Sequence, residues 1–295
     1  MQFSFSGPVL AQALASGIML GGMFALISIG LTLIWGVMKI INFAHGEFLM
    51  LGLYVAYFMV ADVHISPYLT FFVTIPAVAL IGVVIFKATI DPILKDPVMN
   101  QIMLTLGLSL ILQNLALVAF HADVLSVTTR WTTMNIHLGS VVIGVSQLIC
   151  LVGSILATLG IWYFLRTTDL GRSVRAAAQN PTAATLMGIN VPRIYMFAFA
   201  LGSATLGFAA SLMIPFYYTS PTVGAFLGLI AFIVVVLGGM GNLLGCFIGG
   251  IIMGLGESIG AAIFPGSLSR VFSFGIFVLF LVFLPQGVLS RRRRA

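Results

Sequence analysis

Residues 9–35 read VLAQALASGIMLGGMFALISIGLTLIW and contain no charged side chain. A membrane-spanning helix needs roughly 20 mostly apolar residues, so this run is long enough to cross a bilayer. Eight further apolar runs follow, each bounded by charged residues, prolines or polar clusters. They cover residues 42–60, 69–86, 99–119, 146–165, 194–216, 226–239, 244–264 and 271–289. The sequence therefore predicts an all-α fold, a polytopic bundle of transmembrane helices.

The number of spans depends on the seventh run, residues 226–239, which is short for a crossing of its own. It is either a full span or half of a broken or re-entrant helix, so we expect eight or nine spans. No linker, low-complexity tract or soluble domain separates the runs. We therefore expect a single membrane domain over residues 1–295.

The composition excludes a water-soluble protein, because 60% of the residues are hydrophobic and only 7% are charged. A soluble domain carries roughly 25% charged residues. The 32 glycines are typical of helices that pack closely in lipid. We therefore expect most of the surface of the chain to face the lipid bilayer.

The basic residues indicate the orientation in the membrane. They gather in three stretches, Lys87 to Lys95, Arg166 to Arg193 and Arg291 to Arg294. Cytoplasmic loops are enriched in Lys and Arg, so we expect these stretches inside and the loop 120–145 outside. The net charge of +6 then reflects membrane topology, and it does not indicate nucleic-acid binding.

The sequence lacks the motifs of common catalytic and metal sites. It contains no G-x-x-x-x-G-K-[ST] phosphate-binding loop, no H-E-x-x-H and no C-x-x-C. Cys150 and Cys246 lie apart within apolar runs, where small packing residues are expected. We predict no catalytic residues, no metal site and no cofactor on this chain, and therefore a protein that is not an enzyme.

The most informative polar stretch is KIINFAHGEF, residues 39–48, at the start of the second run. A charge at the bilayer centre costs at least about 2.5–3.5 kcal/mol, so it needs a partner or water. In one interpretation Asn42, His45 and Glu47 line or gate an aqueous path. In the other, Lys39 pairs with Glu47 near the interface, and Asn42 and His45 cap the start of a helix.

A second unusual stretch is GGMGNLLG, residues 238–245. Clustered glycines at a span boundary indicate unwound backbone, which in transporters often flanks the substrate route. On that hypothesis Gly238, Gly239 and Gly241 belong to the translocation pathway or its gate. The alternative is an ordinary tight turn on the cytoplasmic side.

The longest predicted cytoplasmic segment covers about residues 166–193. Arg172 to Asn180 is rich in helix formers, Pro181 is suited to start a second short helix, and Gly188 is suited to end it. Helices this short are marginal in water, so they rest on another surface. That surface is either a groove on a soluble partner or the membrane itself.

Several of these residues together resemble a known family. The stretches GGMFALISIGLTLIWG, residues 21–36, and INFAHGEF, residues 41–48, are similar to permeases of the branched-chain amino acid ABC importers, the LivH type. Gly171-Arg172 and VLGGMG at 236–241 share the resemblance, which runs from about residue 17 to 289. Ala183-Ala184-x-x-x-Gly188 matches the E-A-A-x-x-x-G loop of ABC permeases, except that Thr182 replaces its Glu.

The resemblance implies a permease subunit of the bacterial inner membrane that moves branched-chain or related amino acids. Its implied partners are a second homologous permease, two ATP-binding subunits that use the ATP, and a periplasmic substrate-binding protein. The implied coupling loop contains Gly171, Arg172, Arg175, Ala183, Ala184 and Gly188. Two alternatives remain: an ABC permease for urea, an amide or an aromatic acid, and a secondary transporter that works without ATP.

Overall fold

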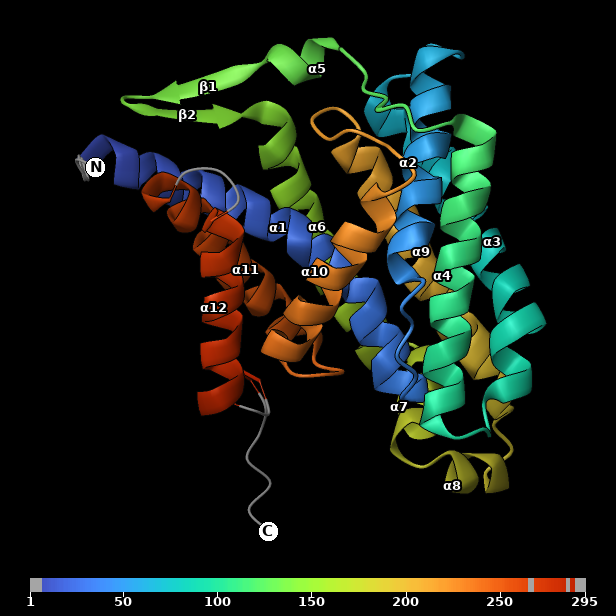
Figure 1. Ribbon diagram of the computed structural model, residues 1–295. Coiled ribbons are helices and arrows are strands. Elements are labelled where there is room, and N and C mark those ends of the chain that lie inside the picture. The colour runs from blue at the N-terminus through green and yellow to red at the C-terminus, as the bar shows by residue number, and fades with distance from the viewer. Residues whose placement is uncertain (1–6, 265–267, 285–286, 290–295) are drawn as a thin grey trace.

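The computed structural model describes residues 7–264, 268–284 and 287–289, and it is almost entirely helical (Figure 1). Within these residues, six apolar helices are long enough to cross a membrane and three are shorter. The apolar helices are α1 (Gly7–Met38), α2 (His45–Ala61), α3 (Phe71–Ile85), α4 (Val98–Phe120), α6 (Val145–Thr167), α9 (Val191–Met213), α10 (Val223–Gly238), α11 (Leu243–Ile263) and α12 (Leu268–Phe283). The predicted all-α membrane bundle is confirmed.

Each of the nine predicted apolar runs corresponds to one of these helices. The short seventh run is α10, a continuous helix of 16 residues. Helix α3 continues at both ends through short turns, η1 (Pro67–Thr70), η2 (Phe86–Ile90) and η3 (Asp91–Ile93), so that Pro67–Ile93 forms one span of 27 residues. The predicted basic stretch Arg291 to Arg294 lies outside the described residues.

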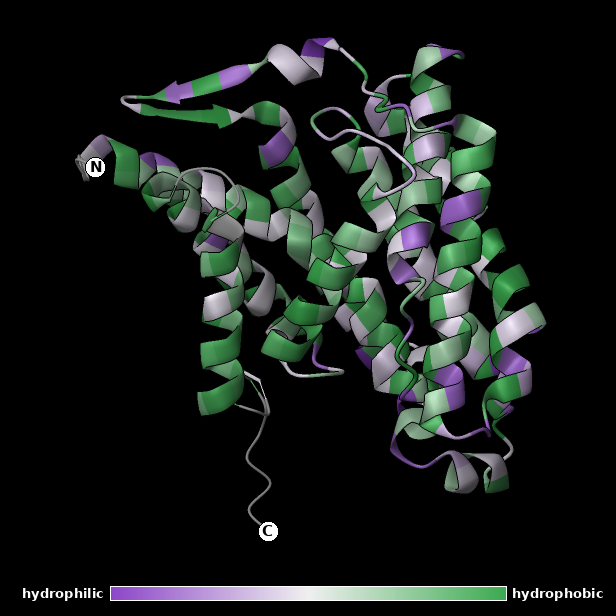
Figure 2. Cartoon of the chain, viewed as in Figure 1, coloured by the Kyte–Doolittle hydropathy of each residue, from purple (hydrophilic) through white to green (hydrophobic). Residues whose placement is uncertain are grey.

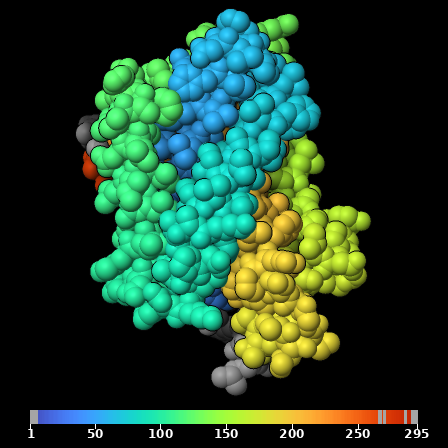
Figure 3. All heavy atoms as spheres, turned by 90° about the vertical axis from the view of Figure 1, so that its right-hand side faces the viewer, coloured from blue at the N-terminus to red at the C-terminus, as the bar shows by residue number. Residues whose placement is uncertain are grey.

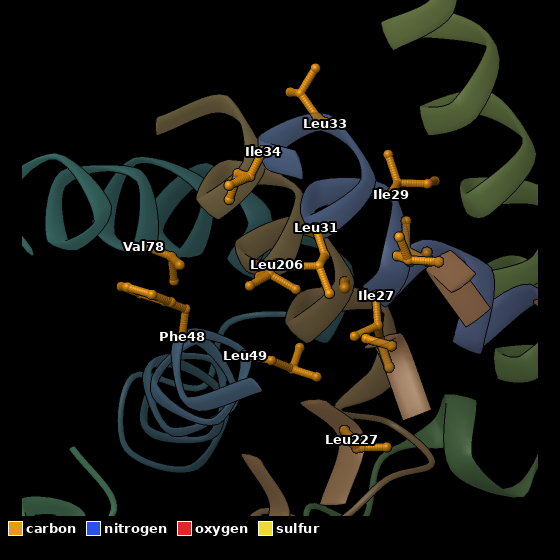
Figure 4. Packing of buried hydrophobic residues seen from close by; sticks show 14 of the residues in the cluster. Ile27, Ile29, Leu31, Leu33, Ile34, Phe48, Leu49, Val78, Leu206 and Leu227 are labelled. Carbon is orange, nitrogen blue, oxygen red and sulfur yellow. The ribbon is translucent and has the colours of Figure 1, made fainter. Parts of the chain in front are cut away.

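Helix α1 runs through the middle of the bundle. In its most apolar 18-residue window 89% of the residues are buried, against 17% for α4. A helix that is hydrophobic on all sides is either buried in a large core or faces lipid, and α1 and α4 represent these two cases. Side chains of α1 such as Ile27 and Leu31 belong to one buried hydrophobic cluster with Phe48, Val78, Leu206 and Leu227 from α2, α3, α9 and α10 (Figure 4).

Small residues allow α1 and α11 to approach each other closely. Gly17 and Gly21 on α1 face Gly250 and Gly254 on α11, and each pair has the small-xxx-small spacing of tightly packed membrane helices. A Cβ atom on Gly21 would lie 2.6 Å from the Cα atom of Ile251, and one on Gly250 would lie 2.7 Å from the backbone N of Ala25. Only glycine therefore fits this contact without a backbone shift.

The outer surface of the bundle is apolar where lipid is expected. Figure 3 shows α3 and α4 covering one side of the molecule, and large hydrophobic side chains such as Phe72, Leu110 and Val118 are exposed there. Hydrophilic residues gather toward the two ends of the helices (Figure 2).

The two ends of the bundle carry different structures. At one end lie the short helix α5 (Arg130–Thr133) and an antiparallel hairpin of β1 (Asn135–Leu138) and β2 (Val141–Gly144), with Asn135 opposite Gly144 (Figure 1). At the other end lie α7 (Asp169–Gln179) and α8 (Pro181–Leu186). This division agrees with the predicted inside and outside loops, whereas the hairpin was not predicted.

Candidate functional site

Asn42, His45 and Glu47, which we call the polar cluster, lie where the chain passes from α1 to α2. Helix α1 ends at Met38, and Lys39 then adopts a left-handed backbone with φ of 60°. The side chain of Asn42 accepts a hydrogen bond from the backbone N–H of Ala44 at 3.1 Å. It thereby fixes the turn that precedes α2.

His45 connects the start of α2 to the middle of α1. Its Nε2 lies 3.1 Å from the carbonyl oxygen of Ile27, 18 residues earlier in the chain. A carbonyl oxygen only accepts, so Nε2–H donates this hydrogen bond and Nδ1 carries no proton when the imidazole is neutral. The side chain is 1% exposed, so this bond holds two helices together within the core.

Glu47 connects α2 to α4. Its Oε1 accepts a hydrogen bond from Ser109 Oγ at 3.0 Å, and the side chain is 0% exposed. Close by, Thr105 Oγ1 donates to the carbonyl oxygen of Ile41 at 3.1 Å. The expected alternative of a Lys39–Glu47 pair is wrong, because Lys39 Nζ donates instead to the carbonyl oxygen of Gly36 at 3.3 Å.

Each side chain of the polar cluster also has an atom without a hydrogen-bond partner among the described residues. These atoms are Asn42 Nδ2, His45 Nδ1 and Glu47 Oε2. Buried polar atoms are nearly always paired, and exceptions call for a functional or structural explanation. The cluster thus keeps unused bonding capacity at a point where several helices meet.

Helix α10 packs directly over the polar cluster through three glycines. A Cβ atom on Gly46 would collide with the carbonyl oxygen of Gly224 and lie 2.8 Å from the Cα atom of Gly228. A Cβ atom on Gly224 would lie 2.8 Å from Cδ of Glu47. The cluster therefore has α1, α2, α4 and α10 in contact at one place.

The glycines at 238–241 form a tight turn between α10 and α11. Gly239 and Gly241 adopt φ of 92° and 84°, a conformation that glycine allows. The side chain of Asn242 caps α11 by accepting a hydrogen bond from the N–H of Gly245 at 3.1 Å. This glycine turn, Gly238–Asn242, agrees with the tight-turn interpretation and lies against α1, because a Cβ atom on Gly36 would be 3.2 Å from the Cα atom of Gly241.

Helices α7 and α8, the loop helices, agree with the predicted break at Asn180-Pro181 and the predicted end near Gly188, whereas α7 begins at Asp169, three residues before the predicted stretch. Thr168 caps α7 by accepting from the N–H of Gly171 at 3.0 Å, and Asn180 caps α8 by accepting from the N–H of Ala183 at 3.0 Å. Pro181 is the first residue of α8. Gly188 follows the helix with φ of 83° and donates its N–H to the carbonyl oxygen of Thr185.

One face of the loop helices is held by the bundle and the other is free of it. Gly171 and Ala184 are buried, whereas Arg172, which pairs with Asp169, and Ala183 are exposed. Past these residues Leu186 and Met187 are 84% and 82% exposed. Two large apolar side chains at the tip of a loop form a surface suited to a protein groove or a membrane surface.

Helix α7 also borders a small space inside the bundle, the inner cavity, of about 110 Å³. Arg175 reaches this cavity from α7, and Gly241 reaches it from the glycine turn. The rest of the lining comes from α1, α6, α7 and α11: Thr32, Leu33, Gly36, Val37, Leu165, Val174, Ala178 and Leu243. The cavity thus connects the loop helices, the glycine turn and the buried helix α1.

Residues 13–281 match the family described as the branched-chain amino acid transport system / permease component. The chain belongs to this family. It is 32% identical over 293 residues to the high-affinity branched-chain amino acid transport system permease protein LivH of Escherichia coli K12, and the match covers 95% of each chain. Over the same length it is 30% identical to BraD of Pseudomonas aeruginosa. No solved structure matched the chain.

A more distant likeness extends to sugar permeases. The ribose import permease protein RbsC of Haemophilus influenzae is 30% identical over 202 residues, which cover 64% of this chain and 61% of RbsC. Members of the family are non-catalytic membrane subunits of ABC transport systems that bind no cofactor themselves, and other subunits handle ATP. This family member is accordingly a multi-pass membrane permease.

Sequence reasoning missed some residues of the site. Ser109 and Thr105 lie within the apolar run 99–119. Ser109 bonds to Glu47, which is 62 positions away in the sequence, and Thr105 bonds to Ile41, which is 64 positions away. Their hydroxyls are four positions apart and therefore lie on one face of α4, and this spacing is the signal that was available. Gly224 and Gly228 have the same four-residue spacing, which marks a close helix contact.

Proposed function

We propose that the chain is the membrane-spanning subunit of an ATP-driven importer that carries branched-chain amino acids across the bacterial inner membrane. The family match over residues 13–281 supports this assignment. So does the similarity over 95% of the chain to LivH, whose name gives branched-chain amino acids as its cargo. The observation that carries the proposal is the exposed apolar tip of the loop helices, Leu186 and Met187, on a segment anchored in the bundle.

The loop helices are the docking element for an ATP-binding subunit. An apolar helix tip that enters a groove is a recurring mode of recognition. One face of α7 is anchored in the bundle through the buried Val174 and Ala177. Because α7 and α1 line the same inner cavity, a movement of the docked subunit that shifts α7 also displaces α1. Two such subunits, a second permease of the same family and a periplasmic substrate-binding protein complete the proposed importer.

The transport step is alternating access driven from outside the chain. When ATP closes the two ATP-binding subunits, the loop helices move and change the contact between Gly36 and the glycine turn. Gly238, Gly239 and Gly241 provide the inner gate. Asn42, His45 and Glu47 provide the joint at which α1, α2, α4 and α10 change their relative positions, and their unpaired atoms gain partners in the other state.

Reconstitution of the complete complex in liposomes tests this function. L-Leucine uptake should require ATP, the two ATP-binding subunits and the binding protein together. Uptake driven by an ion gradient in liposomes that hold the permeases alone would contradict the proposal and favour a secondary transporter. Urea, acetamide and benzoate, offered with the cognate binding protein, test the alternative of a different small solute.

A further inference from the structure

A second and larger space lies at the end of the bundle that carries the hairpin. This space, the outer chamber, has a volume of about 430 Å³, within the range of about 300–1,000 Å³ that is typical of small-molecule sites. Its walls come from α1, α10, α11 and the segment that joins α9 to α10. The lining residues are Leu20, Met23, Phe24, Tyr217, Tyr218, Thr222, Val223, Phe226 and Glu257.

The segment over the chamber is tied to the loop expected outside the membrane. Thr219 and Leu125 exchange two backbone hydrogen bonds, of 2.9 and 2.8 Å. Thr132 Oγ1 donates to the carbonyl oxygen of Pro215 at 2.8 Å. The tyrosines at 217 and 218 stack with ring centroids 5.0 Å apart. These bonds fix the chamber at the outer end, where cargo released by a periplasmic protein arrives.

The lining combines three kinds of chemistry in one chamber. Glu257 supplies a carboxyl group, and Tyr217, Tyr218 and Thr222 supply hydroxyl groups. The remaining residues are apolar. An amino acid with an aliphatic side chain presents a matching set of groups: an ammonium for a carboxylate, a carboxylate for hydroxyl donors, and an apolar chain for an apolar wall.

Glu257 occupies the inner boundary of the chamber. Together with Phe226 it also borders a much smaller cavity of about 10 Å³ between α10, α11 and α12, which is lined further by Ile230, Met253, Ser273 and Phe274. That volume holds about one water molecule at most, so an amino acid does not fit beyond Glu257 on this side of the chamber. A carboxyl group at this boundary is positioned to meet a cargo ammonium before the path narrows.

We propose that the outer chamber binds a zwitterionic aliphatic amino acid during transport, with Glu257 opposite its ammonium group and the tyrosine hydroxyls opposite its carboxylate. This inference rests on the proposed function, and it adds the site and the residues that select an amino acid over an uncharged or purely acidic solute. Glu257 acts as a binding residue for cargo, and no chemical step occurs there.

Protection of an introduced cysteine tests the site in the assembled importer. The native Cys150 and Cys246 are both 0% exposed, so Thr222→Cys provides the reactive thiol. Millimolar L-leucine should slow its labelling by a membrane-impermeant maleimide. The probes 4-methylpentanoate, which lacks the ammonium, and 3-methylbutan-1-amine, which lacks the carboxylate, should protect far less. Ala122→Cys, exposed on the same side but outside the chamber, should show no protection.

Added to Thr222→Cys, Glu257→Gln should raise the L-leucine concentration for half-protection about tenfold, the effect expected from the loss of one charge-assisted hydrogen bond. Tyr218→Phe should weaken protection, whereas Tyr163→Phe, on the exposed side of α6, should not. If Glu257→Gln fails to assemble, the comparison of the three probes on Thr222→Cys alone decides whether the chamber selects a zwitterionic amino acid.

Equal protection by all three probes, or none by L-leucine, would overturn the inference in a complex that takes up L-leucine. Absence of L-leucine uptake by the unmodified complex would instead contradict the proposed function, so the two failures are distinguishable.

Discussion

The outer chamber and the inner cavity border the same helix, α1, and differ about fourfold in volume, 430 against 110 Å³. The chamber touches α1 at Leu20, Met23 and Phe24, and the cavity touches it between Thr32 and Val37. From Phe24 to Gly36 the helix rises roughly 18 Å at about 1.5 Å per residue. One buried helix therefore contacts both the proposed cargo site and the region next to the loop helices.

The difference in volume indicates that the outer end is the one with room for a solute. The outer end has room for a small solute, whereas at the inner end Gly36 and the glycine turn are in van der Waals contact. In the proposed mechanism, a solute bound in the outer chamber leaves inward only after this contact opens. Because α1 is packed on all sides, a displacement at its inner end cannot be absorbed locally, and the polar cluster between the two spaces has to adjust with it.

The largest effect is expected from Gly46→Leu, which breaks the joint between the two ends. The new side chain would collide with the backbone of α10 at Gly224 and Gly228. Overpacking typically costs about 1–3 kcal/mol and sometimes more, and here the obstacle is backbone. We expect no assembled complex by size-exclusion chromatography. Gly107→Leu, where nothing lies within 4 Å of a Cβ atom, should assemble normally.

The next largest effect is expected from Gly241→Val, which disturbs the inner end alone. Valine at a φ of 84° costs about 1–2 kcal/mol, and its side chain presses on Gly36. The pressure on Gly36, and not the backbone strain, should lower L-leucine uptake roughly tenfold, a factor that corresponds to about 1.4 kcal/mol. Gly139→Val bears the same backbone strain at a φ of 62° in the hairpin, away from other atoms, and should transport normally. Equal loss in both variants would refute a role for the Gly36 contact.

Gly188→Val should uncouple ATP hydrolysis from transport. No atom lies within 4 Å of its Cβ position, so only the φ of 83° resists the change, and the end of α8 should rearrange. ATP hydrolysis should continue in proteoliposomes while uptake falls several-fold. Gly188→Asn, which tolerates the left-handed conformation, should stay coupled. Normal uptake in the valine variant would count against docking through the loop helices.

The smallest effect is expected from Glu47→Ala in the polar cluster. The change leaves the hydroxyl of Ser109 without its acceptor, at a cost of about 1–3 kcal/mol. The melting temperature of the purified complex should fall by a few degrees. In Glu47→Gln, which keeps an acceptor oxygen, the melting temperature should fall less. Identical melting of both variants and the unmodified complex would show that the hydrogen bond to α4 contributes nothing to stability.

The sequence predicts the helices well because each one needs only a long apolar run, and it predicts the start and end of α8 because Pro181 and Gly188 act locally. It does not tell α1 from α4, since both are apolar on all sides and only packing decides which one faces lipid. The contact between Glu47 and Ser109 joins residues 62 positions apart. The outer chamber needs four segments to be brought together, and the hairpin depends on pairing across the turn at Gly139.

Alternating access is tested most directly by comparing the two ends of α1 in the working importer. Leu20→Cys lies in the outer chamber and Val37→Cys in the inner cavity, and their maleimide labelling rates can be measured with and without ATP and vanadate. Alternating access predicts reciprocal changes, with one site becoming more accessible as the other becomes less so. Rates that rise or fall together, or that do not respond to the nucleotide, would contradict alternating access driven through the loop helices.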